Sequence, residues 1–316
     1  MVDLFVSIKK GKFDDVIAKM RKKKYVVATA NRTLNEIFLN FSDLKPRSAE
    51  FKTIKDIVIK MRGVESIEIV KGHLKAKNTS MKESLSNNTC RLIFDIDSTI
   101  TRGGVGTIHP SIPPIFQKIE DKGIWIYVAT GRSLYNLIQI VNNNPIQETS
   151  IAENGGIILG FAKDGYIEHG SKTEPQKILT HLQKKYNIKE DMKQGERITE
   201  VILLQSDVTM KQIKQAQKAT NAKITIHQSQ NSYHISKAGV SKGSAILELG
   251  KRLKWGNSFK IAVGDSQMDV SMFDSCNYSF APKNADAFAK EACVEILNGN
   301  YEEAISNLYD LIINSH

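Results

Sequence analysis

Beyond position 90, apolar residues fall into short strand-like runs separated by segments with helical periodicity. The strand-like runs are RLIFDI at 91–96, IWIYVAT at 124–130 and FKIAV at 259–263. Helical spacing of apolar residues is found at 113–122, 132–141 and 243–254. Strands that alternate with helices predict a parallel sheet with right-handed crossovers, so we expect a doubly wound, Rossmann-like α/β core.

Residues 157–236 interrupt this core with a pattern of their own. We expect two short strands, then a helix at 175–187, a strand at 200–205, a helix at 209–220 and a hairpin formed by 224–228 and 232–236. This order predicts a compact α+β lid inserted into the core. The core is then made of residues 90–156 and 237–316.

The first 72 residues predict a separate α+β module. Strand-like segments at 2–8, 25–28, 37–41 and 64–70 are combined with amphipathic helical stripes at 13–20 and 51–61. The order β-α-β-β-α-β is that of a ferredoxin-like domain, although 37–41 is also compatible with a helix. The polar residues 73–89 are weakly periodic and are typical of a linker.

Composition narrows the class of protein. Apolar residues make up 41% and charged residues 25% of the 316 residues, which is typical of a soluble globular protein. No apolar run approaches the roughly 18–20 residues of a membrane helix, and the N-terminus lacks the charge order of a signal peptide. The 3 cysteines show no CxxC spacing, which argues against a disulfide framework. We therefore expect a cytoplasmic protein without a membrane partner.

The net charge of +10 is concentrated at the N-terminus. Residues 1–88 hold 19 Lys and Arg against 10 Asp and Glu, whereas the rest of the chain is close to neutral. A basic module can indicate nucleic acid, but no RNP-like aromatic run is present. We therefore favour a solvated basic face or a dimerisation or regulatory module over nucleic-acid binding, and a homodimer stays an open alternative.

Four short motifs stand at the carboxyl ends of predicted strands or beside them, at the edge where open parallel sheets bind ligands. They supply six polar side chains: Asp95, Asp97, Thr130, Lys242, Asp265 and Asp269. Alternation along an extended strand places Asp95 and Asp97 on one face, where a cation must neutralise them. An oxygen-rich site of this kind selects a hard ion, most naturally Mg²⁺.

The same set of side chains suits phosphoryl transfer. A carboxylate is a competent nucleophile toward phosphorus, and a second carboxyl group can protonate the leaving alkoxide and then activate water. A lysine and a hydroxyl group supply the positive charge and the donor that the phosphoryl oxygens need. The residues themselves therefore predict a phosphoryl-transfer site.

The four motifs are DIDST (95–99), ATGR (129–132), SKG (241–243) and GDSQMD (264–269). In this order they resemble the motifs of the haloacid dehalogenase-like hydrolase superfamily, over roughly residues 90–310. A lid between the second and third motifs resembles the type IIB branch of that superfamily. The size of the lid and the sequence GVSKGSAI after it resemble the archaeal phosphoglycolate phosphatase and sucrose-phosphate-phosphatase-like group.

The resemblance implies a role for each motif residue. Asp95 would be the nucleophile and Asp97 the general acid and base. Thr130 and Lys242 would bind the phosphoryl group. The ligands of Mg²⁺ would be Asp95, the backbone carbonyl of Asp97, Asp265 and Asp269, the last directly or through water.

Two positions depart from the superfamily pattern. Ser98 stands where glycine is common, and Met268 stands where many relatives have asparagine. The serine is a mild change. The methionine removes a polar contact of the fourth motif but no metal ligand.

Several candidate residues also have a purely structural interpretation. Thr130 and Asp269 are typical of helix starts, and Lys242 is one lysine among many. In the lid, Arg197 and His234 are candidate substrate contacts, although a solvated side chain is the commoner outcome. We expect Arg132 and Ser133 to begin a helix rather than to bind a ligand.

The function that the sequence predicts is a Mg²⁺-dependent phosphomonoester phosphatase with an aspartyl-phosphate intermediate. By resemblance, the substrate is a small phosphorylated metabolite such as 2-phosphoglycolate. Two alternatives remain open. One is a phosphosugar phosphatase or phosphomutase of the same fold, and the other is a regulatory or nucleic-acid-binding protein with a vestigial site.

Overall fold

The computed structural model divides the chain into two compact units, Met1–Lys77 and Asn78–His316. The residues that it describes are 2–8, 27–31, 36–40, 64–71 and 89–313, the last range without 104–105, 161–164, 191–196, 230 and 257. Among these residues no helix is long and apolar enough to cross a membrane.

The first unit contains a four-stranded antiparallel sheet. Its strands are β1 (Val2–Ile8), β2 (Val27–Asn31), β3 (Glu36–Asn40) and β4 (Val64–Lys71), in the order β2-β3-β1-β4. The first and third strands are central and antiparallel, as a ferredoxin-like domain requires. The two helices predicted at 13–20 and 51–61 lie outside the described residues, so that part of the module stays a prediction.

The second unit is built on a five-stranded parallel sheet in the order β15-β14-β13-β5-β6. The strands are β5 (Cys90–Phe94), β6 (Trp125–Val128), β13 (Phe259–Val263), β14 (Tyr278–Ala281) and β15 (Glu295–Ile296). The predicted α/β core with a parallel sheet is confirmed, and β5, β6 and β13 are the three apolar runs seen in the sequence.

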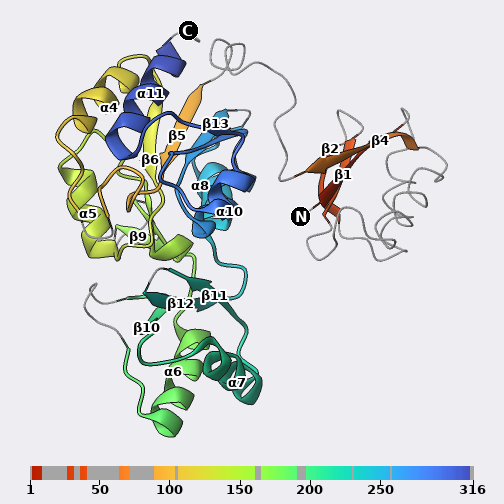
Figure 1. The fold of residues 1–316 in the computed structure, drawn as a ribbon, viewed down its shortest axis with the longest axis vertical. Coiled ribbons are helices and arrows are strands. Elements are labelled where there is room, and N and C mark those ends of the chain that lie inside the picture. Colours follow the sequence, from red (N-terminus) through yellow and green to blue (C-terminus); the bar gives the residue numbers. More distant parts are fainter. Residues whose placement is uncertain are drawn as a thin grey trace. The chain divides into compact units, whose positions relative to one another are not determined.

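Both faces of this sheet are covered by helices (Figure 1). Leu92 and Phe94 of β5 pack with α4 (Ile112–Glu120), α5 (Leu134–Asn142) and α11 (Tyr301–Ile313). Ile93 points to the other face and packs with α8 (Lys242–Arg252), α9 (Val270–Asp274) and α10 (Ala287–Ala292). Alternate residues of one strand thus serve two apolar layers, which is why these strands are apolar throughout.

The inserted region has a small hydrophobic core of its own. Its sheet has the order β10-β12-β11, formed by β10 (Val201–Leu204), β11 (Ile224–Gln228) and β12 (Ser232–Lys237). The helices α6 (Thr173–Tyr186) and α7 (Met210–Thr220) share buried residues with it. The hairpin expected at 224–228 and 232–236 is present, with His227 opposite His234.

The first strands of the inserted region pack on the core instead. A second antiparallel sheet consists of β7 (Ile151–Ala152), β8 (Ile157–Leu159) and β9 (Tyr166–Glu168). Ile157 and Ile158 belong to the two apolar layers of the core sheet. The separate apolar core of the lid therefore begins only at α6, while the predicted lid limits of 157–236 stay a proposal.

Two short 3₁₀ helices lie next to the carboxyl edge of the parallel sheet, at Glu153–Gly155 and Gln267–Asp269. The first has left-handed backbone at Glu153 (φ 51°), Asn154 (φ 52°) and Gly155 (φ 102°). A Cβ atom on Gly155 would lie 2.1 Å from the backbone oxygen of Ser241. Glycine is required here because this turn packs directly against the residue that caps α8.

Candidate active site

The predicted motif residues come from neighbouring strand ends of the parallel sheet. Asp95 follows β5, and its backbone N–H donates to the carbonyl oxygen of Val263, the last residue of β13, at 2.8 Å. Asp265 stands two residues after that strand. Adjacent parallel strands therefore deliver the two carboxylates to one edge of the sheet.

Three carboxylates form a compact cluster at this edge. Asp95, Asp265 and Asp269 each offer an oxygen atom, and these atoms lie within 4.8 Å of one another. The ammonium nitrogen of Lys242 lies 2.5 Å from Oδ1 of Asp95 and 2.6 Å from Oδ1 of Asp269. Lys242 is 2% exposed, so this is a buried ion-pair network rather than a surface one.

Lys242 is placed by the start of α8. Ser241 caps this helix, and its hydroxyl accepts the N–H of Ser244. A Cβ atom on Gly243 would lie 2.0 Å from the backbone oxygen of Ser271, so α8 approaches α9 too closely for any side chain there. The glycine of the SKG motif thus lets the lysine reach the carboxylates.

The cluster carries more negative charge than one lysine neutralises. Burial, reinforced by the charges of Asp95 and Asp269, raises the pKa of Asp265 to about 9. Burial also raises the pKa of Asp95 to about 7, although Lys242 lowers it. Burial opposes the charge of Lys242, but the two aspartates raise its pKa above the usual range. A further cation between these oxygens would favour the charged carboxylates.

Asp269 holds the loop that carries Asp265. Its Oδ2 atom accepts hydrogen bonds from the backbone N–H groups of Asp265 and Ser266, both at 3.0 Å, and from the Ser266 hydroxyl at 3.1 Å. Its Oδ1 atom accepts from Lys242. Both oxygens are therefore engaged, whereas Asp265 accepts the Thr99 hydroxyl at 3.2 Å on Oδ1. This makes Asp265 the more accessible metal ligand of the two.

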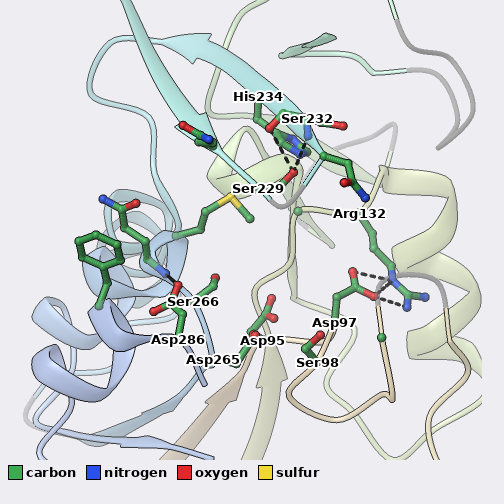
Figure 2. Close-up of a pocket in the computed structure, with 17 residues that line it drawn as sticks. Asp95, Asp97, Ser98, Arg132, Ser229, Ser232, His234, Asp265, Ser266 and Asp286 are labelled. Carbon is green, nitrogen blue, oxygen red and sulfur yellow. Dashed lines mark hydrogen bonds and ion pairs between the residues drawn. The ribbon is translucent and has the colours of Figure 1, made fainter. Parts of the chain in front are cut away.

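Asp97 is held by an arginine that sequence reasoning assigned to a helix start. Arg132 donates from Nη2 to Oδ1 of Asp97 at 2.6 Å and from Nε to both carboxylate oxygens at 3.1 Å (Figure 2). The same Nη2 donates to the Gly106 carbonyl at 2.8 Å. The helix begins later, at Leu134, with Ser133 as its N-cap. Ser133 therefore begins the helix as expected, whereas Arg132 precedes it.

Thr130 begins the loop after β6, and it is fully buried. Its hydroxyl oxygen accepts the N–H of Arg132 at 3.1 Å. Thr130 and Lys242 are not among the described residues that line the cleft, whereas the neighbouring Gly131 is. Phosphate binding by Thr130 and Lys242 stays a prediction.

A cleft of about 710 Å³ opens over the carboxylates. One side belongs to the core and includes Asp95, Asp97, Arg132 and Asp265. The opposite side comes from the lid hairpin and is lined by Gln228, Ser229, Asn231, Ser232 and His234. Figure 2 shows His234 and Ser232 across the cleft from Asp95 and Asp265. The lid therefore faces the position that a substrate would occupy.

The two lid candidates are placed differently. His234 is 5% exposed and lines the cleft, and its Nδ1 atom lies 3.4 Å from Oε1 of Glu200. Arg197 is 2% exposed and is not among the described lining residues. Its Nη1 atom donates to the Gly131 carbonyl at 2.6 Å. The structure thus brings His234 to the cleft and Arg197 to the loop beneath it.

Comparison with known families matches this part of the chain. The family model described as haloacid dehalogenase-like hydrolase matches residues 92–179 and 161–308, which together are well over half of the chain. The chain belongs to this hydrolase family. The resemblance read from the four motifs is confirmed, and with it the expectation of an enzyme of this class.

Two curated relatives of this chain come from archaea. A phosphoglycolate phosphatase of Nitrosopumilus maritimus is 28% identical over 216 residues, which cover 68% of this chain and 93% of the relative. A phosphoglycolate phosphatase of Halorubrum lacusprofundi is 26% identical over 223 residues, covering 69% and 94%. These matches fit the expectation of a phosphatase.

Solved structures share the fold at low identity. A protein of Thermoplasma acidophilum superposes with a TM-score of 0.62 at 20% identity, covering 72% of this chain and 99% of that one. A phosphatase of the haloalkanoate superfamily from Bacteroides thetaiotaomicron gives 0.60 at 15%, covering 73% and 96%. A subclass IIB sugar phosphatase gives 0.57 at 17%, covering 72% and 98%. The predicted fold with a type IIB lid is confirmed.

Ser98, one of the two departures from the family pattern, has left-handed backbone with φ 62°. Its carbonyl oxygen accepts the side-chain amide of Asn284 at 2.7 Å, and Asn284 in turn accepts the N–H of Tyr301 at 3.1 Å. The other departure, Met268, lines the cleft beside Gln267. Glycine would adopt the conformation of Ser98 without steric cost.

We predict that Ser98→Gly stabilises the protein. Relief of the left-handed backbone contributes roughly 1–2 kcal/mol, and the greater freedom of glycine in the unfolded chain removes about half of that. The expected net gain is about 1 kcal/mol, measured by urea unfolding. Ser111→Gly, at a residue with φ −75°, is the control and should not stabilise. A loss of stability in Ser98→Gly would contradict the strain at this position.

Proposed function

We propose that this chain is a Mg²⁺-dependent phosphomonoester phosphatase that works through an aspartyl-phosphate. The observation that carries the proposal is the carboxylate of Asp95, which borders the cleft with Lys242 at 2.5 Å and two further carboxylates within 4.8 Å. A nucleophile, an ammonium group and an oxygen-rich metal site at one edge of the sheet are the parts that phosphoryl transfer needs.

The proposed reaction has two steps, and the residues at the sheet edge support each of them. An Asp95 carboxylate oxygen attacks phosphorus and forms an oxygen–phosphorus bond, while the bond to the leaving oxygen breaks as that oxygen takes the proton of protonated Asp97. Asp97 then takes a proton from water as that water attacks the phosphoryl group and releases Asp95. Arg132 holds the Asp97 carboxylate beside the cleft at 2.6 Å. Lys242 offsets the charge on Asp95 and on the phosphoryl oxygens.

The donor set fits Mg²⁺. Hard oxygen ligands from Asp95, Asp265 and the Asp97 backbone carbonyl would hold the ion, with Asp269 acting through water because both of its oxygens are engaged. The raised pKa of Asp265, caused first by burial, indicates a carboxylate that still needs a cation. When bound, the ion would reduce repulsion between the nucleophile and the phosphoryl group.

A small phosphorylated metabolite such as 2-phosphoglycolate is the leading substrate candidate, and the names of the archaeal relatives support it. A phosphosugar is the second candidate, for phosphatase or mutase chemistry, because the lid side of the cleft offers mainly amides and hydroxyls. Such groups suit the hydroxyl groups of a sugar. His234 is the titratable lid group among the described lining residues and would face a substrate carboxylate.

The proposal also covers the cellular location of the protein and the role of its N-terminal module. We propose a cytoplasmic location, which fits the three free cysteines at 90, 276 and 293. The basic N-terminal module is proposed to serve in dimerisation or regulation rather than in binding nucleic acid.

We predict that Asp95→Asn lowers kcat by about 10⁴-fold or more, because an amide cannot serve as the nucleophile. The measurement is phosphate release from p-nitrophenyl phosphate with Mg²⁺ and with a chelator, and the chelator should abolish turnover of the unmodified enzyme. The matched control is Glu248→Gln, a carboxylate paired with Arg252 on α8, which should retain activity. Substantial turnover by Asp95→Asn would refute the nucleophile, and turnover in the chelator would refute the metal.

We predict that His234→Ala lowers kcat/KM for 2-phosphoglycolate by about tenfold, since a hydrogen bond to a charged group is lost. The loss for p-nitrophenyl phosphate should be smaller, because that ester has no carboxylate. The comparison uses a panel that also contains hexose phosphates and nucleotides. Efficient turnover of a hexose phosphate without turnover of 2-phosphoglycolate would favour the second candidate instead.

A further inference from the structure

All three backbone carbonyl groups of the loop Thr130–Gly131–Arg132 accept hydrogen bonds. The Thr130 carbonyl accepts the N–H of Asn154 at 3.0 Å, and the Arg132 carbonyl accepts the N–H of Glu153 at 2.9 Å. The middle carbonyl, that of Gly131, accepts Nη1 of Arg197 at 2.6 Å. Two of these donors are backbone groups of the left-handed turn, and the third is a side chain that arrives from the lid.

The Arg197 guanidinium belongs to a buried polar network. Its Nη1 atom lies 3.1 Å from Oε1 of Glu200, whose side chain is fully buried. Oε2 of Glu200 accepts the side-chain amide of Asn154 at 3.1 Å, and Oε1 lies 3.4 Å from Nδ1 of His234. Glu200 and His234 are adjacent to or within the lid strands β10 and β12. One network thus joins the lid wall of the cleft to the loop beneath it.

The peptide between Gly131 and Arg132 transmits the effect of Arg197 to Thr130. A trans peptide is planar, with its C=O and N–H pointing in opposite directions. Here the C=O is fixed by Arg197 and the N–H donates to the Thr130 hydroxyl oxygen at 3.1 Å. Because that oxygen accepts a hydrogen bond from the backbone N–H of Arg132, its own hydroxyl proton is directed to another acceptor.

We propose that Arg197 is a positioning residue, which fixes the loop 130–132 in its phosphate-binding conformation through the Gly131 carbonyl. The inference rests on the proposed phosphatase function and on the prediction that Thr130 of this loop binds the transferred phosphoryl group. Arg197 acts from the lid segment, so the lid contributes to the phosphoryl site as well as to the recognition of the remaining part of the substrate.

Direct contact of Arg197 with the substrate is the competing explanation. Arg197 is 2% exposed, and its guanidinium group contacts the Gly131 carbonyl and the Glu200 carboxylate. Arg197 is not among the described residues that line the cleft. A contact with the substrate would affect one class of phosphomonoester more than another. A positioning role affects every phosphomonoester alike, and inorganic phosphate with them, because the phosphoryl group is what they share.

The test compares Arg197→Lys and Arg197→Ala with the unmodified full-length chain. Three quantities are measured: the inhibition constant of inorganic phosphate, kcat/KM for p-nitrophenyl phosphate and for 2-phosphoglycolate, and the melting temperature. In Arg197→Ala we expect the inhibition constant of inorganic phosphate to rise about tenfold and both kcat/KM values to fall by about tenfold or more. The reason is that a misplaced loop weakens the contacts with the phosphoryl group, which all these molecules share. Arg197→Lys should retain part of the activity.

Two controls separate positioning from stability. Lys172→Met removes a hydrogen bond to the backbone carbonyl of Arg197 (3.1 Å) and leaves the guanidinium contact with Gly131, so it should leave the phosphate constant unchanged. Millimolar guanidinium chloride should restore part of the activity of Arg197→Ala, whereas sodium chloride should not. If Arg197→Ala does not fold because Glu200 is left buried without its partner, Arg197→Met combined with Glu200→Gln takes its place.

Two results would overturn the proposal. One is a lower melting temperature with an unchanged phosphate constant, which would make Arg197 merely structural. The other is a loss confined to 2-phosphoglycolate, which would make it a substrate contact. Failure of the phosphatase function is a separate result, because the unmodified chain would then turn over no phosphomonoester. In that case phosphate affinity, measured by calorimetry, still decides: weaker binding by the Arg197 variants supports the proposal, and equal or absent binding refutes it.

Discussion

The buried ammonium group of Lys242, at 2.5 Å from Asp95 and 2.6 Å from Asp269, is the interaction on which the site depends. Burying charges costs several kcal/mol per ion unless partners with good geometry compensate for lost water. Much of the surrounding structure supplies that geometry. Gly243 permits the close approach of α8 and α9, and Asp269 fixes the Asp265 loop through three hydrogen bonds. The core sheet thus holds concentrated charge that phosphoryl transfer requires.

Polar contacts connect the lid with the site on the core. The lid hairpin lines one side of the cleft, and the buried network of Glu200, His234 and Arg197 reaches the loop after β6. Such networks are costly when partly satisfied and rigid when complete. In the proposed function, a lid attached in this way would select substrates and would also constrain the phosphoryl site. Variation of the hairpin residues could then change the substrate without altering the carboxylate cluster.

Sequence reasoning found the parts of the site that follow directly from strand ends. Asp95 and Asp265 follow apolar runs whose parallel pairing was predictable, and Lys242 begins a helix with a serine cap. It did not find the contact of Arg132 with Asp97, because the two residues are 35 positions apart and no periodicity links them. The contact of Arg197 with Gly131 spans 66 positions and was missed for the same reason. Which distant residue a loop side chain contacts depends on tertiary packing, and local sequence patterns do not predict such contacts.

The proposed mechanism depends on a covalent phosphoryl intermediate on Asp95. The most direct test is mass spectrometry of the protein after rapid acid quenching during turnover of a phosphomonoester, with and without hydroxylamine treatment. Nucleophilic attack by Asp95 predicts one phosphoryl group on this residue, removed by hydroxylamine and absent from Asp95→Asn. A phosphoryl group on another residue would contradict it. So would turnover of p-nitrophenyl phosphate by Asp97→Asn without a trapped phosphoenzyme, because this ester needs no general acid to form the intermediate, whereas hydrolysis of the intermediate still needs the base.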